Sequence, residues 1–239
     1  MLVAAAVCPC PPLLVPEVAA GAAPELDAAR TACADALGVL AASRPDLLVV
    51  VGPAEQGGRG THPQGTRGSF GGFGADVDVR LGAPEAPDAD PERVLPPSLA
   101  VAAWLLERIG WSDAPVEGLG VGEPLAPERC VQVGRDIAAR AERVALLVMG
   151  DASACRTLKA PGYLDERAAP FDARVARALA TADVTALEEL DPGLAYELKA
   201  SGRAPWQVLA GAADGAGLSG ALLYEDAPYG VGYLVAAWS

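Results

Sequence analysis

The sequence contains a single histidine, His62, among its 239 residues, and it contains no asparagine. Aromatic residues make up only 5% of the chain while hydrophobic residues make up 51%, so the core must consist mainly of alanine, valine and leucine. A single imidazole is too few for sites that bind a metal through several histidines. The scarcity of histidine therefore limits the chemistry that this chain can perform.

Basic residues are also in the minority, because 18 Lys and Arg residues face 31 Asp and Glu residues, and the net charge is −13. A protein that binds DNA, RNA or an anionic membrane needs a basic surface. We therefore expect no nucleic-acid partner and no membrane partner. The acidic excess is spread over the expected helix faces and a loop at 84–92, which is typical of a solvated surface.

Long hydrophobic runs are missing, since no stretch approaches the roughly 18 apolar residues that suggest a membrane-spanning helix. The first residues, MLVAAAVCPCPPLLVPE, lack the basic start of a signal peptide, and prolines interrupt them early, so a buried strand fits better. The five cysteines are an odd number and have no spacing typical of a disulfide framework. Together these features predict a reduced, cytoplasmic protein.

Continuous apolar runs indicate the strands of a buried sheet. The clearest runs are 2–7, 46–52 and 143–150, and further strands are expected at 76–81, 115–119, 219–224 and 230–237. Apolar residues at helical spacing predict helices at 24–42, 97–109, 127–141, 171–182, 184–190, 193–200 and 205–213. This alternation predicts one α/β domain over 1–239, with a mixed, mostly parallel central sheet and helices on both faces. The last two strands, joined across DAPYG, should pair antiparallel.

Three loops leave the strongest strands at the place where open α/β sheets bind ligands, beyond the carboxyl ends of the strands. They read CPCPPLLVPE, GPAEQGGRG and GDASACRTLKAPGY. The second begins a segment with eight glycines, 53–74, which lacks a phosphate-loop motif and fits a mobile lid or a crossing loop. If the loops converge, their candidate pocket residues are Cys8, Cys10, Glu55, His62, Asp151, Ser153, Arg156, Lys159 and Tyr163.

The same three segments, together with DAPYGVGYLVA near the carboxyl terminus, resemble the class III extradiol ring-cleavage dioxygenase superfamily. This superfamily includes the subunit-B-like dioxygenases and their Memo-like relatives. The similarity follows the family order over most of the chain, and the PGY at 161–163 and the FD at 171–172 match its scaffold positions. The resemblance implies a single domain that contains a crevice for a small molecule.

The chain departs from the family at each of its histidines. The family segments Pro-His-Pro-Pro and Ser-Pro-His, which supply metal ligands, read PCPP and GPA here, with Cys10 and Ala54 at the histidine positions. The Gly-Asp-x-Ser-His segment, which supplies the acid–base histidine, reads GDASA and ends at Ala154. The last metal position is an acid or a cysteine in the family. Here it falls on either Glu197 or Ser201, and the resemblance does not decide between them.

These replacements change what the site can bind. Non-haem Fe(II) that activates oxygen uses two imidazoles and a carboxylate, and alanine offers no donor atom. Proton transfer from a catechol also needs a group with a pKa near neutrality. We therefore expect no cofactor. The alternative is Fe(II) or Zn held by Cys10, His62 and Glu197.

Each candidate also has a simpler interpretation. Cys8 and Cys10 could form a metal or redox pair, but cysteines more often act as small buried hydrophobes. The polar neighbours of His62 favour a solvent-exposed loop histidine over a ligand. The loop at 151–159, with Asp151, Ser153, Arg156 and Lys159, could bind a small anion, or Asp151 could simply accept hydrogen bonds from backbone amides.

The leading hypothesis is a degenerate member of this superfamily that lacks the iron site and acts as a small-molecule-binding or assembly protein. The alternative is an active enzyme, such as a dioxygenase-like or other metal-dependent oxidoreductase or hydrolase. Its rebuilt site would use Cys10, His62, Asp151 and either Glu197 or Ser201. A homo-oligomer is a third hypothesis, because related dioxygenases assemble through their helices.

Overall fold

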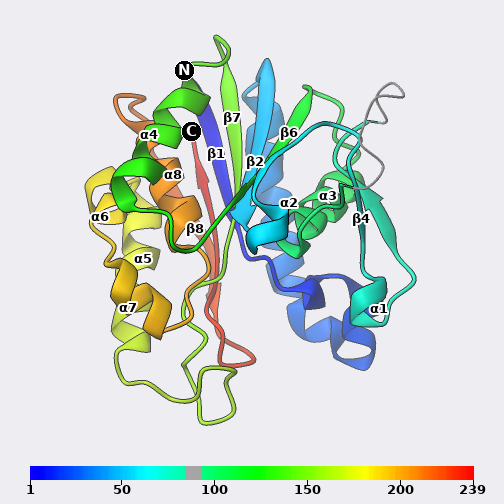
Figure 1. Ribbon diagram of the computed structural model, residues 1–239, viewed down its shortest axis with the longest axis vertical. Coiled ribbons are helices and arrows are strands. Elements are labelled where there is room, and N and C mark those ends of the chain that lie inside the picture. Colours follow the sequence, from blue (N-terminus) through cyan, green and yellow to red (C-terminus); the bar gives the residue numbers. More distant parts are fainter. Residues whose placement is uncertain (84–92) are drawn as a thin grey trace.

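Four parallel strands form the centre of a seven-stranded sheet (Figure 1). The computed structural model describes residues 1–83 and 93–239, and the acidic segment expected at 84–92 lies outside the described residues. The central strands, in their spatial order, are β6 (Val116–Val121), β2 (Leu47–Pro53), β7 (Val144–Met149) and β1 (Leu2–Cys8). All residues of β7 and nearly all of β1 are buried, because helices cover both faces of the sheet.

Antiparallel strands complete both edges of this sheet. Beyond β1 lie β9 (Tyr233–Trp238) and β8 (Gly220–Asp226), and beyond β6 lies β3 (Gly60–His62). The predicted mixed sheet is confirmed, as is the antiparallel pairing of the last two strands. The strand expected at 76–81 is β5 (Asp78–Arg80), which pairs with β4 (Arg67–Ser69) in a separate two-stranded sheet.

Helices cover the two faces of the sheet in separate layers (Figure 1). One layer contains α2 (Asp27–Ala42) and α3 (Pro97–Arg108), and the short α1 (Pro16–Ala19) lies near the end of that layer. The other contains α4 (Pro127–Ala138), α5 (Ala168–Thr181), α6 (Val184–Glu188), α7 (Pro192–Glu197) and α8 (Arg203–Ala213). The predicted α/β fold with helices on both faces is therefore confirmed.

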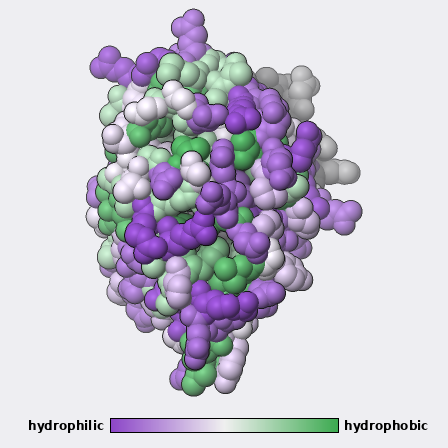
Figure 2. All heavy atoms as spheres, turned by 90° about the vertical axis from the view of Figure 1, so that its left-hand side faces the viewer, coloured by the Kyte–Doolittle hydropathy of each residue, from purple (hydrophilic) through white to green (hydrophobic). Residues whose placement is uncertain are grey.

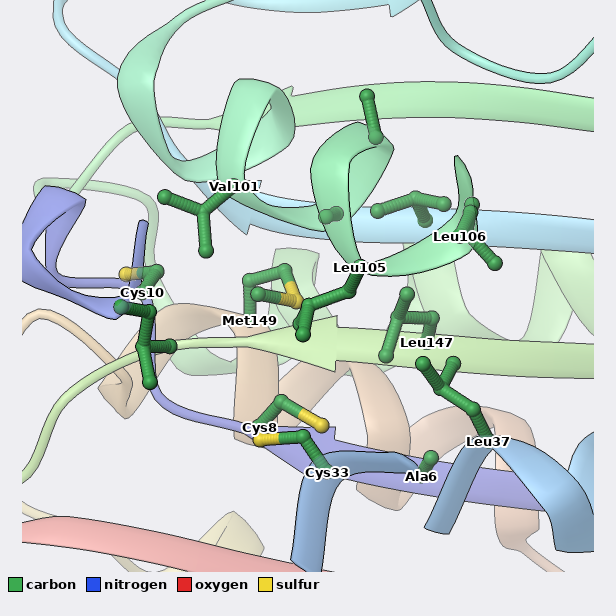
Figure 3. Close-up of a cluster of buried hydrophobic side chains, with 14 of the residues drawn as sticks. Ala6, Cys8, Cys10, Cys33, Leu37, Val101, Leu105, Leu106, Leu147 and Met149 are labelled. Atoms are coloured by element: carbon green, nitrogen blue, oxygen red, sulfur yellow. The ribbon is translucent and has the colours of Figure 1, made fainter. Parts of the chain in front are cut away.

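Alternation along the strands divides the buried side chains between two cores. In β1, Ala4, Ala6 and Cys8 belong to the core beneath α2 and α3, whereas Ala5 and Val7 belong to the other core. Figure 3 shows the first core, where Leu105 and Val101 of α3 lie over Met149 of β7, and Cys8 lies beside Cys33 of α2. Small residues in β1 leave room for these larger side chains.

The outer face of the second helix layer carries hydrophilic side chains that surround smaller hydrophobic areas (Figure 2). Ion pairs contribute to this surface, for example Arg174 with Glu189 at 3.3 Å and Arg135 with Asp214 at 3.1 Å. None of the described helices combines the length and apolar character needed to cross a membrane.

Several helix boundaries differ from the sequence expectation, and two of the differences have a clear structural cause. The helix expected at 24–42 begins at Asp27, after a 3₁₀ segment that contains Pro24, because proline has no backbone N–H to donate within a helix. The helix expected at 193–200 ends at Glu197, and Lys199 adopts a left-handed conformation with φ 56°. This left-handed residue reverses the chain before Ser201.

His62 is buried, so the prediction that it lies exposed in a loop is wrong. The glycine-rich segment folds back onto the sheet as β3 and pairs His62 with Gly118 of β6. The imidazole Nε2 lies 2.8 Å from the Gly58 carbonyl oxygen, and Nδ1 has no hydrogen-bond partner. Burial lowers the pKa of the imidazole below its ordinary value, and the charge of Arg93 lowers it further.

The single histidine permits a direct test by nuclear magnetic resonance. We expect the imidazole of the folded protein to titrate below pH 6.5 and to carry its neutral-state proton on Nε2, since the Gly58 carbonyl can only accept a hydrogen bond. The same resonances in urea-unfolded protein serve as the control, with a pKa near 6.5. A folded-state pKa at or above the unfolded value would contradict the buried position.

Candidate functional site

A cavity of about 820 Å³ opens at the carboxyl ends of the central strands. Cys10 follows β1, Ala54 and Glu55 follow β2, and Glu123 follows β6. The first turn of α3 and the connection from α7 to α8 close the remaining walls, and Ser201 lies in that connection. The cavity therefore occupies the position where open α/β sheets bind ligands.

Three hydrogen bonds hold the floor of the cavity together. The Cys10 backbone N–H donates to Asp151 Oδ1 at 2.8 Å, and the Asp151 N–H donates to Ser201 Oγ at 3.0 Å. The Gly202 N–H donates to the Asp151 carbonyl oxygen at 2.9 Å. These bonds join the segments after β1 and β7 to the start of α8, so the floor positions of Cys10 and Ser201 depend on Asp151.

Burial shifts both titratable groups of the floor toward their neutral forms. It raises the pKa of the Asp151 carboxyl to about 6, although the hydrogen bond from the Cys10 N–H opposes this shift. Burial also raises the pKa of the Cys10 thiol well above its ordinary value, and the negative charge of Asp151 adds to that effect. A hydrogen bond with the Ser201 side chain partly offsets the shift. At neutral pH the Cys10 thiol is thus protonated, which makes it a weak nucleophile and a weak metal ligand.

A second polar cluster holds the loop after β7 but contributes nothing to the cavity lining. Asp172, which is 1% exposed, accepts hydrogen bonds from the Ser153 N–H at 2.8 Å and the Ser153 hydroxyl at 2.9 Å. Arg156 Nη1 donates to the same carboxylate at 2.9 Å. Ser153 and Arg156 are thereby committed to Asp172. The cluster expected from Asp151, Ser153, Arg156 and Lys159 does not form a common binding surface at the cavity.

Of the thirteen candidate residues, Cys10, Ala54, Glu55 and Ser201 line the cavity. Glu197 is exposed and pairs with Arg167 at 2.6 Å instead of facing the cavity. The residues that do not line it are Cys8, His62, Asp151, Ser153, Ala154, Arg156, Lys159, Tyr163 and Glu197.

Several of these residues have other structural roles. Cys8 lies in the core beside Cys33, separated from Cys10, so the two thiols do not form a pair (Figure 3). The Ala154 N–H donates to the Leu198 carbonyl at 2.9 Å, which fixes the loop against the end of α7. Lys159 and Tyr163 are exposed on the same loop.

Other residues that line the cavity were not predicted. Most of them lie in segments that the apolar runs of the sequence do not mark as part of a site. Glu123 follows β6, a strand that was predicted without a candidate residue at its carboxyl end. Arg59 lies beyond the short 3₁₀ segment after β2, and Ser98 lies in the first turn of α3. Ligands of open α/β sheets bind beyond the carboxyl ends of the strands, and this rule, applied to β6 as well, predicts Glu123. No sequence signal identified Ser98.

The donor atoms of this cavity do not fit the iron site of the class III dioxygenases. Ala54 supplies no donor, the Cys10 thiol is neutral, and Ser201 offers an uncharged hydroxyl. Asp151 already accepts the Cys10 N–H and does not line the cavity; of the two glutamates that do, Glu123 pairs with Arg203 and Glu55 is exposed. Within residues 1–83 and 93–239, no group of three or more His, Cys, Asp or Glu side chains is arranged to hold a metal ion.

The comparisons with known proteins give information on the fold alone. No family model matches the sequence, and no curated protein matches it either. Among solved structures, the chain is similar to the crystal structure of the uncharacterized protein JW3007 from Escherichia coli K12. The TM-score is 0.55, the identity is 16%, and the match covers 99% of each chain. At this identity the likeness supports a common fold over the whole length.

The cavity predicts which cysteine reacts first. All five thiols are free and buried, but Cys10, at 8% exposure, lines the cavity, whereas the other four are at most 1% exposed. Methyl methanethiosulfonate should therefore modify Cys10 first, faster as the pH rises toward the raised pKa of its thiol. Mass spectrometry of digests identifies the site. Rapid modification that persists in Cys10→Ser would show that another thiol reacts as fast, which would contradict this prediction.

Asp151→Asn tests the electrostatics of the floor. The amide oxygen of the variant still accepts the Cys10 N–H, but its side chain cannot ionise. Because folding raises the Asp151 pKa to about 6, its stabilising effect is present below pH 4 and is lost as the pH rises through 6. We expect the variant to gain stability relative to the wild type between pH 4 and 7, by about 1–3 kcal/mol.

Urea unfolding at a series of pH values measures this difference. Asp113→Asn, on an exposed loop, is the matched control. A stability difference that stays constant or shrinks as the pH rises would contradict a partly buried, destabilised Asp151 carboxylate.

Proposed function

We propose that this protein is a ligand-binding member of the class III extradiol dioxygenase superfamily that has lost its iron site and does not cleave aromatic rings. Its cavity holds a small organic molecule. The chain retains the order of the family segments, and two of the three altered histidine positions, Cys10 and Ala54, line one cavity.

The observation that carries this proposal is the meeting of Cys10, Ala54 and Ser201 in the same cavity. The resemblance matches Cys10 and Ala54 to two metal histidines, and Ser201 is one of two candidates for the last metal position. The three residues come from segments far apart in the sequence, so their convergence supports the resemblance. Glu197 pairs with Arg167 outside the cavity, which favours Ser201 for the last position.

The same three residues argue against ring cleavage. A thiol, a methyl group and a hydroxyl supply neither the imidazoles nor the free carboxylate that oxygen-activating iron requires. The side chain that would transfer the proton is also missing, because Ala154 stands at the position of the family's acid–base histidine and lies outside the cavity lining.

A rebuilt active site is less well supported by the geometry. It would need Cys10, His62, Asp151 and an acid in reach of one another. Glu197 is exposed and ion-paired, and the His62 imidazole is buried against the Gly58 carbonyl and does not line the cavity. Only Cys10, Asp151 and Ser201 remain together, and they hydrogen-bond one another.

The cavity itself suits a binding function. Its volume of about 820 Å³ falls within the range of ordinary ligand pockets, about 300–1,000 Å³. Nine of its 17 lining residues are alanine, proline, glycine or valine, and the other eight carry a polar or charged side chain. Such a surface binds an apolar body by burial and orients it through a small number of polar contacts.

Restoring the missing donors provides the test. Wild-type protein, loaded anaerobically with Fe(II) and desalted, should retain no stoichiometric iron and take up no oxygen with catechols. The variant Cys10→His/Ala54→His/Ser201→Glu supplies two imidazoles and a carboxylate in one cavity, and we expect it to retain about one iron per chain. Metal content is measured by mass spectrometry and oxygen uptake with an electrode.

The matched control is Cys10→His/Ala221→His/Ser201→Glu, which moves one histidine to an exposed position on β8. Circular dichroism verifies that both variants fold. Stoichiometric iron with oxygen uptake in the wild type would overturn the proposal. If the restored and control variants fold and retain equal iron, the three positions do not correspond to a metal site.

A further inference from the structure

One wall of the cavity carries an arginine that makes no ion pair within the described part of the chain. Arg59 lines the cavity, and its Nε has one long contact, 3.4 Å, with the Ala54 carbonyl oxygen. Its guanidinium lies against Gly122, where an added Cβ would be 2.5 Å from Nε. The glycine therefore makes room for the arginine at this wall.

The backbone of this arginine is fixed, although its guanidinium forms no ion pair with any residue in 1–83 or 93–239. Arg93 Nη2 donates to the Arg59 carbonyl oxygen at 3.1 Å, and the preceding Gly58 carbonyl oxygen contacts the His62 Nε2 at 2.8 Å. A guanidinium held at a cavity wall retains several N–H donors that can bind a carboxylate, sulfonate or phosphate group.

The acidic residues of the lining leave Arg59 available. Glu123 is held by Arg203, which is 1% exposed and donates to both its carbonyl oxygen and, at 3.4 Å, its carboxylate. Glu55 is exposed to solvent. Neither glutamate forms an ion pair with Arg59.

The first turn of α3 adds to the positive electrostatic potential that Arg59 creates in the cavity. Pro96, Pro97 and Ser98 line the wall at the start of this 12-residue helix. The first backbone N–H groups of a helix have no acceptor within it and carry a partial positive charge. Ser98 Oγ donates to the Pro53 carbonyl at 2.7 Å, so the side chain does not cap these groups.

Much of the remaining lining is apolar, with Val94, Pro96 and Ala195 among its residues, and Lys199 is the second basic residue that lines the cavity. We propose that the cavity selects an apolar organic molecule that carries one acidic group, and that Arg59 binds this group. This inference rests on the proposed binding function and adds the class of ligand.

Two fluorescent dyes that differ by one acidic group provide the test. 8-Anilinonaphthalene-1-sulfonate carries a sulfonate, and N-phenyl-1-naphthylamine has the same aromatic body without it. We expect Arg59→Gln to weaken binding of the sulfonate by about tenfold, because a charged hydrogen bond is lost, and to change binding of the neutral dye less than twofold. Arg59→Lys should restore part of the affinity for the sulfonate.

Salt dependence gives an independent readout. The whole chain has a charge of −13 and repels anions at long range, whereas Arg59 attracts them locally. Binding of the sulfonate to the wild type should weaken as salt is added if Arg59 dominates. Binding that strengthens with salt would overturn the inference, because it would mean that repulsion by the chain controls the affinity.

Controls separate this inference from the proposed function. Arg67→Gln, exposed on β4 and outside the cavity lining, should change neither dye. Ala54→Trp fills the cavity and should abolish binding of both dyes. If neither dye binds the wild type, the binding function itself fails for this ligand class. If both bind, and Arg59→Gln weakens both or neither, only the role of Arg59 is wrong.

Discussion

The hydrogen bond from the Cys10 backbone N–H to the Asp151 carboxylate is the contact on which the cavity floor depends. It joins the segment after β1 to the segment after β7, and the Asp151 N–H continues the connection to Ser201. Gly150 and Gly202 allow the two backbones to approach so closely that a side chain on Gly150 would collide with the Gly202 Cα. Burying a carboxylate costs free energy, so this arrangement trades stability at neutral pH for a fixed floor.

The central sheet could be predicted from the sequence because parallel strands covered on both faces must be continuously apolar. The runs that became β1, β2 and β7 have that property. β3 could not be predicted in the same way, because three residues carry no periodic signal and their pairing depends on β6, more than fifty residues later. This missing long-range pairing is the physical reason why His62 was expected in solvent, although it is buried.

The candidate site was predictable where strand ends determine position and unpredictable where distant residues compete for a side chain. Cys10 and Ala54 follow strand ends directly. Ser153 and Arg156 also follow a strand, but Asp172 from α5 binds both and holds them away from the cavity. Glu197 and Ser201 are one helical turn apart in the sequence, so spacing alone could not decide which of them matches the last metal position. The left-handed Lys199 breaks that spacing, and of these two residues only Ser201 lines the cavity, at its floor.

The distribution of charge around the cavity constrains how an acidic ligand could lie in it. Asp151 lies behind the floor, and in its ionised form it opposes a second negative charge near Cys10. Arg59 and the first turn of α3 offer positive potential at the walls. An acidic group is therefore most stable at the wall, with the apolar body directed toward the thiol and hydroxyl of the floor. In this arrangement the wall supplies the charge that the acidic group needs, and the neutral thiol and hydroxyl of the floor oppose no charge.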